Sequence, residues 1–182
     1  MWHYLFGTES QPTSRRAWIR AVGVLGASAG LGACGFRLRG SQAFVFNRIA
    51  IVPYPGGLVV QELRRSFGPA VQVLAADAPI AQAQLVLEVS NELREKVVVG
   101  INASGQVREF QLRMKVRLAL RTAKGKEIMD GAEILQQRDI SYNESAALAK
   151  EAEEALLYRD MQSDIVQQIL RRLAAIQASQ LD

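Results

Sequence analysis

One side chain in the sequence is set up for a defined covalent reaction, the thiol of Cys34. It is the only cysteine among 182 residues, and it follows the tripeptide Leu-Gly-Ala at 31–33, at the end of a short apolar run. Small residues directly before a cysteine suit a peptidase that cuts there, after which the thiol carries lipid. The arginine pair at 15–16, the apolar run, the small-residue site and the lone cysteine are together typical of a bacterial lipoprotein signal. The alternative is a buried structural cysteine at the end of an N-terminal helix.

The predicted signal divides the chain into three parts. Residues 1–33 would be removed, residues 34–45 would form a lipidated tether, and residues 46–182 would form a single domain that is long enough to bury a core. Acylation would hold the chain on a membrane, because burial contributes about 0.8 kcal/mol for each CH₂. Gly35, where an aspartate would retain a lipoprotein in the inner membrane, favours the periplasmic face of the outer membrane. Residues 14–20 resemble a twin-arginine export signal, but an ordinary positive segment also explains them, so the export route stays open.

The rest of the chain offers little for catalysis or metal binding. The only histidine is His3, inside the predicted signal, and Cys34 is the only thiol. A Ser-His-Asp or Cys-His arrangement and most zinc sites are therefore excluded from the mature chain. The sequence also lacks a glycine-rich phosphate loop. We expect no enzyme activity, no metal and no cofactor.

Charged residues are unevenly distributed along the mature chain. Residues 34–126 hold 14 basic and 6 acidic side chains, whereas residues 127–182 hold 5 basic and 11 acidic ones. The first part can meet an anionic ligand while the second stays solvated. Alternatively, the two parts neutralise each other in the fold. In the densest positive run, cations alternate with apolar residues, which places four of them on one face of a predicted strand. We call this set the cation ladder: Arg113, Lys115, Arg117 and Arg121.

The strand that carries the cation ladder is the clearest element of the sequence. Over residues 107–121 apolar and polar side chains alternate, which predicts one face toward a core and one face outward. Residues 71–74 suffice only for a brief strand and are not counted. The other expected elements are strands over 46–53, over 84–101 with a bulge, and over 127–142, with hairpin turns at 102–105 and 123–126.

Two helices are expected as well. Apolar residues recur at four-residue spacing from Val59 to Phe67, before a Gly-Pro stop, which predicts a short amphipathic helix. A second helix is expected from about Ser145 to Ala178, running about 50 Å at 1.5 Å per residue, with Asn143 or Ser145 as its cap. The predicted fold is α+β, with two helices packed on one face of a four-stranded mixed, mostly antiparallel sheet. The face with the cation ladder would stay open.

A series of short stretches in consistent order is similar to one known family. The most specific is CGFRLRG at 34–40, and the others are RIAIV at 48–52, GQ at 105–106, EFQL at 109–112, ALAK at 147–150, YRDM at 158–161 and QILRRL at 168–173. Together they span the mature chain and resemble the LptE family of lipopolysaccharide-assembly lipoproteins. The resemblance implies a protein that plugs the LptD β-barrel, helps that barrel assemble, and binds lipopolysaccharide during its insertion into the outer leaflet.

The resemblance also implies residues that bind lipopolysaccharide. Lys150 falls where the family has a lysine that contacts this ligand. A second basic contact belongs in the hairpin loop, but Ala103 stands there, so this part of the pattern fails. Arg108, just after the turn, is the substitute nearest in sequence. The structural alternative for Lys150 is an i,i+4 ion pair with Glu154, which contributes only ~0.3–0.5 kcal/mol.

The phosphates of lipid A are strong hydrogen-bond acceptors, which suits Lys150, Arg108 and the cation ladder. For the ladder, a solvated sheet face is the alternative, because polar side chains point outward by default in an antiparallel sheet. The expected partners are LptD, lipopolysaccharide and outer-membrane lipid through the acylated Cys34, with no nucleic acid. The alternative function is an accessory lipoprotein of another envelope transport system, which would have no stoichiometric barrel partner.

Overall fold

The computed structural model describes residues 42–181. The predicted signal, Cys34 and most of the predicted tether therefore lie outside the described residues. Within 42–181, no helix combines the length and the apolar character that crossing a bilayer would require. The elements in chain order are β1 (Arg48–Val52), α2 (Leu58–Ser66), β2 (Gln72–Val73), the 3₁₀ turn Ile80–Gln82, β3 (Leu85–Ile101), β4 (Val107–Thr122), β5 (Glu127–Ser141), the 3₁₀ turn Glu144–Ala146, α3 (Ala147–Ala174) and the 3₁₀ turn Ala178–Gln180.

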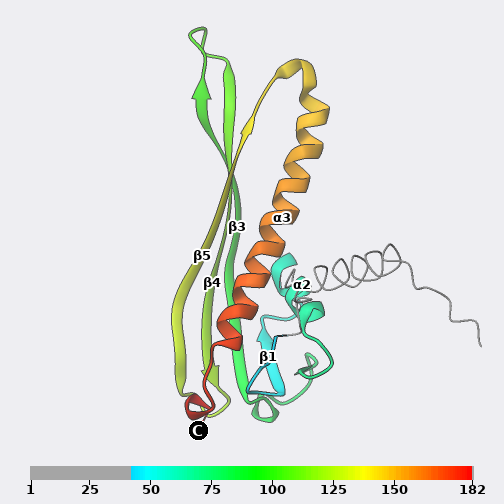
Figure 1. Cartoon of the computed structure of the whole chain (residues 1–182), viewed down its shortest axis with the longest axis vertical. Helices are drawn as coiled ribbons and strands as arrows, with labels where there is room; N and C mark the ends of the chain where they lie inside the picture. The colour runs from blue at the N-terminus through cyan, green and yellow to red at the C-terminus, as the bar shows by residue number, and fades with distance from the viewer. Residues whose placement is uncertain (1–41, 182) are drawn as a thin grey trace, which may run out of the picture. The chain divides into compact units, whose positions relative to one another are not determined.

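The strands form one mixed sheet in the order β2-β1-β3-β4-β5, with α2 and α3 beside it (Figure 1). β1 runs parallel to both β2 and β3, and β3, β4 and β5 form an antiparallel meander. The predicted α+β class with two helices and a mixed sheet is confirmed, but the count of four strands is wrong. The fifth strand, β2, is only two residues long and is held by hydrogen bonds from Gln72 N to Asn47 O and from Leu74 N to Ile49 O. A segment this short is too brief to show the alternation of apolar and polar residues by which a strand is predicted.

The core lies between the sheet and the helices. Alternate residues of β4, from Leu112 to Leu120, are at most 1% exposed, and they pack in one cluster with Val59 and Leu63 of α2 and with α3 from Met161 onward. The predicted core face of this strand is therefore confirmed. The opposite face is covered near β1 by the 74–83 segment, through a smaller cluster of Ala50, Leu74, Ala83 and Val86.

The long helix is shorter than the sequence predicts. α3 spans 28 residues, about 42 Å, because a 3₁₀ turn takes the place of its expected start at 144–146 and the α-helix ends at Ala174, four residues before the expected Ala178. Asn143, one of the two predicted caps, caps the 3₁₀ turn before α3: its Oδ1 atom accepts a hydrogen bond from Ser145 N at 3.1 Å. The N-cap of α3 itself is Ala146, without a side-chain hydrogen bond, so neither predicted residue caps the α-helix. All buried residues of α3 lie from Met161 onward, and its first half, 147–160, contributes only the partly buried Leu157 and Tyr158 to the edge of the core.

β3 changes character at the expected bulge. Its register with β4 shifts between Ser90 and Leu93, and Asn91 has a φ of 51°. The bulge directs Glu92 toward α2, where its carboxylate accepts hydrogen bonds from Leu58 N at 3.0 Å and Val59 N at 3.2 Å. These donors are the unpaired N–H groups of the first helical turn, so a strand residue caps the helix.

Beyond this bulge the fold has little core. We call this region the distal part: residues 92–112, which include the β3–β4 hairpin, together with residues 147–160 of α3. Figure 1 shows the hairpin and the start of α3 at the same end of the sheet. Large apolar side chains are exposed here, namely Leu93, Val98, Val99, Ile101, Leu148 and Leu156. The distal part is therefore held together mainly by polar contacts.

Candidate functional site

Lys150 lies in the first half of α3, against the end of β5. Its Nζ atom donates to Ser141 Oγ at 3.0 Å and forms an ion pair with Glu153 at 2.9 Å. The expected alternative partner, Glu154, instead pairs with Lys96. The side chain of Lys150 remains 22% exposed, so the ammonium group is oriented by the protein and still reachable from solvent.

Lys96 reaches the same place from β3. Its Nζ atom is 2.6 Å from the carboxylate of Glu154 and 4.4 Å from the centre of the Phe110 ring. Phe110 in turn packs edge-on against Tyr142, with 5.2 Å between the ring centres. A small cavity of about 110 Å³, which we call the distal cavity, is lined by both lysines, by these two aromatic rings, and by Ile140, Ser141, Ala147, Glu151 and Glu154.

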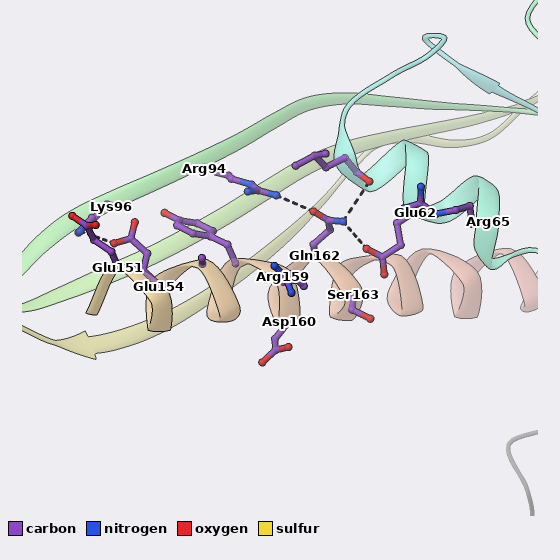
Figure 2. A pocket seen from close by; sticks show the side chains of 13 residues that line it. Glu62, Arg65, Arg94, Lys96, Glu151, Glu154, Arg159, Asp160, Gln162 and Ser163 are labelled. Carbon is purple, nitrogen blue, oxygen red and sulfur yellow. Dashed lines mark hydrogen bonds and ion pairs between the residues drawn. The ribbon is translucent and has the colours of Figure 1, made fainter. Parts of the chain in front are cut away.

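A larger groove, of about 1110 Å³, lies beside this cavity between α2, α3 and β3. Figure 2 shows that a chain of hydrogen bonds crosses it: Arg94 donates to Gln162 at 2.8 Å, and Gln162 donates to Glu62 at 2.6 Å. The charged groups around the groove are mixed in sign. The network therefore ties the three elements together and does not concentrate one charge.

Tyr158 fixes the first half of α3 to the sheet. Its hydroxyl donates to the Glu95 carbonyl at 2.7 Å, and the Arg94 guanidinium lies 5.3 Å from the ring centre. Burial raises the pKa of this hydroxyl, and the nearby Glu154 carboxylate raises it further. The hydroxyl therefore stays protonated and available as a donor at neutral pH.

Arg108 lies at the same end of the sheet as Lys150. Its carbonyl accepts a hydrogen bond from Tyr142 N at 2.7 Å, and Tyr142 directly follows the Ser141 that contacts Lys150. The Arg108 guanidinium donates to Gln106 Oε1 at 3.3 Å and is exposed. The fold therefore brings the two basic residues of the predicted site to one end of the sheet.

The cation ladder lies elsewhere. Its residues alternate with the buried side chains of β4, which places them on the face opposite α3. Acidic residues of the neighbouring strands stand directly across from three of them: Glu95 opposite Arg113, Glu133 opposite Arg117, and Glu127 opposite Arg121. A single bound headgroup cannot contact both this face and Lys150. The cross-strand carboxylates also favour the solvated-face alternative.

One lysine that lines the distal cavity, Lys96, was not predicted from the sequence. Lys96 stands opposite Leu112 in the β3–β4 register, so its side chain lies on the helix side of the sheet. The predicted hairpin turn at 102–105 sets that register, and it was the one signal in the sequence that could have placed Lys96 on the helix side of the sheet. Among residues 42–181, no cluster of His, Cys, Asp and Glu side chains suits a metal ion.

Comparisons with known proteins agree with this architecture. A solution structure of lipoprotein B from Nitrosomonas europaea is 33% identical, with 78% of this chain and 91% of that chain covered at a TM-score of 0.67. Rare lipoprotein B from Shewanella oneidensis (22% identical, covering 71% and 95%, TM-score 0.59) and a minor lipoprotein from Acinetobacter baumannii (19% identical, covering 73% and 94%, TM-score 0.56) share the fold. No curated protein matches the chain in sequence. The LptE lipopolysaccharide-assembly model matches residues 45–173. The chain therefore belongs to the LptE family of lipopolysaccharide-assembly lipoproteins.

Proposed function

We propose that this protein is a subunit of the lipopolysaccharide translocon, anchored to the outer membrane through the acylated Cys34 and facing the periplasm. In this role it plugs the LptD β-barrel, helps the barrel assemble, and binds lipopolysaccharide as it passes to the outer leaflet. Family membership supports lipopolysaccharide assembly in general. The observation that carries the binding role is Lys150, an oriented and partly exposed ammonium group beside a cavity.

The chemistry of lipid A suits this site. Its phosphates are anionic acceptors, and hydrogen bonds between charged groups are about twice as strong as neutral ones. Lys150 and Arg108 supply such donors at one end of the sheet. The cation ladder of Arg113, Lys115, Arg117 and Arg121 stays a prediction, and we centre the site away from it because carboxylates stand across from its residues.

The exposed apolar side chains of the distal part support the partnership with a barrel. Several large apolar side chains exposed in one region of a protein are typical of surfaces that contact a partner. Leu148 at 83%, Ile101 at 65% and Leu156 at 55% exposure are the most accessible of them. In the proposed function, LptD covers this surface. An accessory lipoprotein of a different transport system would not co-purify with LptD in equal amounts.

The double variant Lys150→Asp with Arg108→Asp is expected to bind purified lipopolysaccharide at least tenfold more weakly than the wild type. Each lost charged hydrogen bond contributes about 1.5–3 kcal/mol, and a tenfold change corresponds to about 1.4 kcal/mol. Binding is measured on the full-length lipoprotein in detergent, and a thermal melt checks the fold.

The matched control is Lys124→Asp with Arg48→Asp, which makes the same change in charge at two exposed positions outside the distal part. This control should bind as the wild type does. If both double variants lost affinity for lipopolysaccharide equally, the change in net charge alone would explain the loss. Lys150 and Arg108 would then not belong to the site.

A further inference from the structure

The distal cavity holds two ammonium groups that come from different elements. Lys96 projects from β3 and Lys150 from α3, and both line the same 110 Å³ cavity. An ammonium group has three donors and no acceptor. Lys96 has the Glu154 carboxylate as its hydrogen-bond acceptor and the Phe110 ring beneath it, while Lys150 has Glu153 and Ser141. Each lysine therefore retains donor capacity directed by its surroundings.

Each ammonium group is also held by one carboxylate of α3. The Lys96–Glu154 distance is 2.6 Å and the Lys150–Glu153 distance is 2.9 Å. Glu153 is 49% exposed and Glu154 22% exposed, so both carboxylates border on solvent. Ion pairs that border on solvent in this way are weak, because solvent screens the attraction and the long side chains lose freedom.

A phosphate group competes with such carboxylates on favourable terms. It carries up to two negative charges and three strong acceptor oxygens, so it can satisfy both ammonium groups at once. The displaced carboxylates return to water, which costs little because they already border on it. The Phe110 ring supports the Lys96 ammonium from below whether the acceptor is carboxylate or phosphate.

We infer that Lys96 and Lys150 form a two-lysine phosphate site whose ammonium groups are held by Glu154 and Glu153 until a phosphate displaces these carboxylates. This inference rests on the proposed function, since it identifies the group that lipopolysaccharide presents there as a phosphate monoester. It adds Lys96 to the binding residues, and it makes Glu154 an internal competitor of the ligand.

Four variants of the full-length lipoprotein in detergent test the inference: Lys96→Gln, Glu154→Gln, their double variant, and Lys150→Gln. The measured quantity is the dissociation constant for lipopolysaccharide, compared with that for lipopolysaccharide whose lipid A phosphates have been removed. We expect Lys96→Gln to weaken binding about tenfold, through loss of one charged hydrogen bond. We expect Glu154→Gln to strengthen it about threefold, through loss of a weak ion pair.

The double variant separates competition from a general charge effect. If Glu154 acts only by holding Lys96, the gain from Glu154→Gln disappears once Lys96 is absent, so the double variant should bind like Lys96→Gln. Asp164→Asn is the matched control, because it removes a 2.8 Å ion pair between α3 and Arg138 of β5 with the same charge change outside the cavity. It should leave the dissociation constant unchanged.

Competition experiments identify the source of the phosphate. Inorganic pyrophosphate should displace lipopolysaccharide, and phosphatidylglycerol vesicles should not. Displacement by the vesicles would overturn the assignment to a phosphate monoester, because the phosphate of that headgroup is a diester.

Different results would overturn the two-lysine site and the proposed function. Normal binding by Lys96→Gln, alongside weak binding by Lys150→Gln, would overturn the two-lysine site and leave the proposed function in place. Unchanged binding by both variants would overturn both. A tightening by Glu154→Gln that persists in the absence of Lys96, or that Asp164→Asn reproduces, would overturn the competition.

Discussion

Replacing Ile165 with alanine is expected to lower the free energy of unfolding by about 3 kcal/mol, within the range of roughly 2–5 kcal/mol for isoleucine-to-alanine changes in a core. Ile165 is 0% exposed and lies in the main cluster between α3 and the sheet. The truncation removes apolar burial and leaves a cavity that the packed neighbours fill only in part. Urea unfolding followed by circular dichroism measures the change.

Leu156→Ala is the matched control on the same helix. Leu156 is 55% exposed in the first half of α3, so its truncation should change the free energy of unfolding by about 0.5 kcal/mol or less. A similar loss in both variants would contradict the division of α3 into a buried and an unburied half. The control also tests the proposed partner contact, because Leu156→Ala should weaken co-purification with LptD while leaving the fold intact.

Replacing Gly56 with alanine is expected to destabilise the protein by about 3 kcal/mol. Gly56 has a φ of 74°, where a residue with a side chain is strained by about 1–3 kcal/mol. A Cβ atom there would also lie 2.6 Å from the Cβ and Cγ1 atoms of Val60, which is 1% exposed in the first turns of α2. Relief of that overlap requires the helix to move, at a cost of about 1–3 kcal/mol. Chemical unfolding again provides the measurement.

Gly105→Ala separates the two causes. Gly105 has a φ of 80° at the tip of the β3–β4 hairpin, and a Cβ atom there would have nothing within 4 Å. Only the backbone strain applies, so a loss of about 1 kcal/mol is expected. Were the two alanine variants equally destabilised, the overlap with Val60 would have no measurable cost.

Long, regular elements were predictable from the sequence, and short or coupled ones were not. The alternation in β4 runs from Glu109 to Arg121, and the predicted core face from Leu112 to Leu120 is confirmed. β2 was missed because its two residues are defined by pairing with β1, which no local pattern records. The ends of α3 were placed too far out, because its apolar stripe continues to Ile176 after the α-helix has ended at Ala174.

The sequence predicted only those residues of the candidate site that can be recognised without knowing their neighbours in space. Lys150 came from the family resemblance, which needs no knowledge of neighbours. Lys96 required the register of two strands and the position of a helix 58 residues later in the chain. The cation ladder was correctly assigned to one face of β4, but the carboxylates across from it became visible only with the pairing to β3 and β5.

The uneven burial of α3 has a consequence for how the helix moves. Its first half, 147–160, is held by side-chain contacts such as those of Tyr158 with Glu95 and of Lys96 with Glu154, whereas residues 161–173 are locked into the core. We expect backbone amides in the first half to exchange with deuterium by local fraying, and those of 165–173 to exchange only when the whole unit unfolds. In the proposed function, a bulky glycolipid would gain access by transiently detaching one end of a helix, at a small fraction of the energy that holds the molecule together.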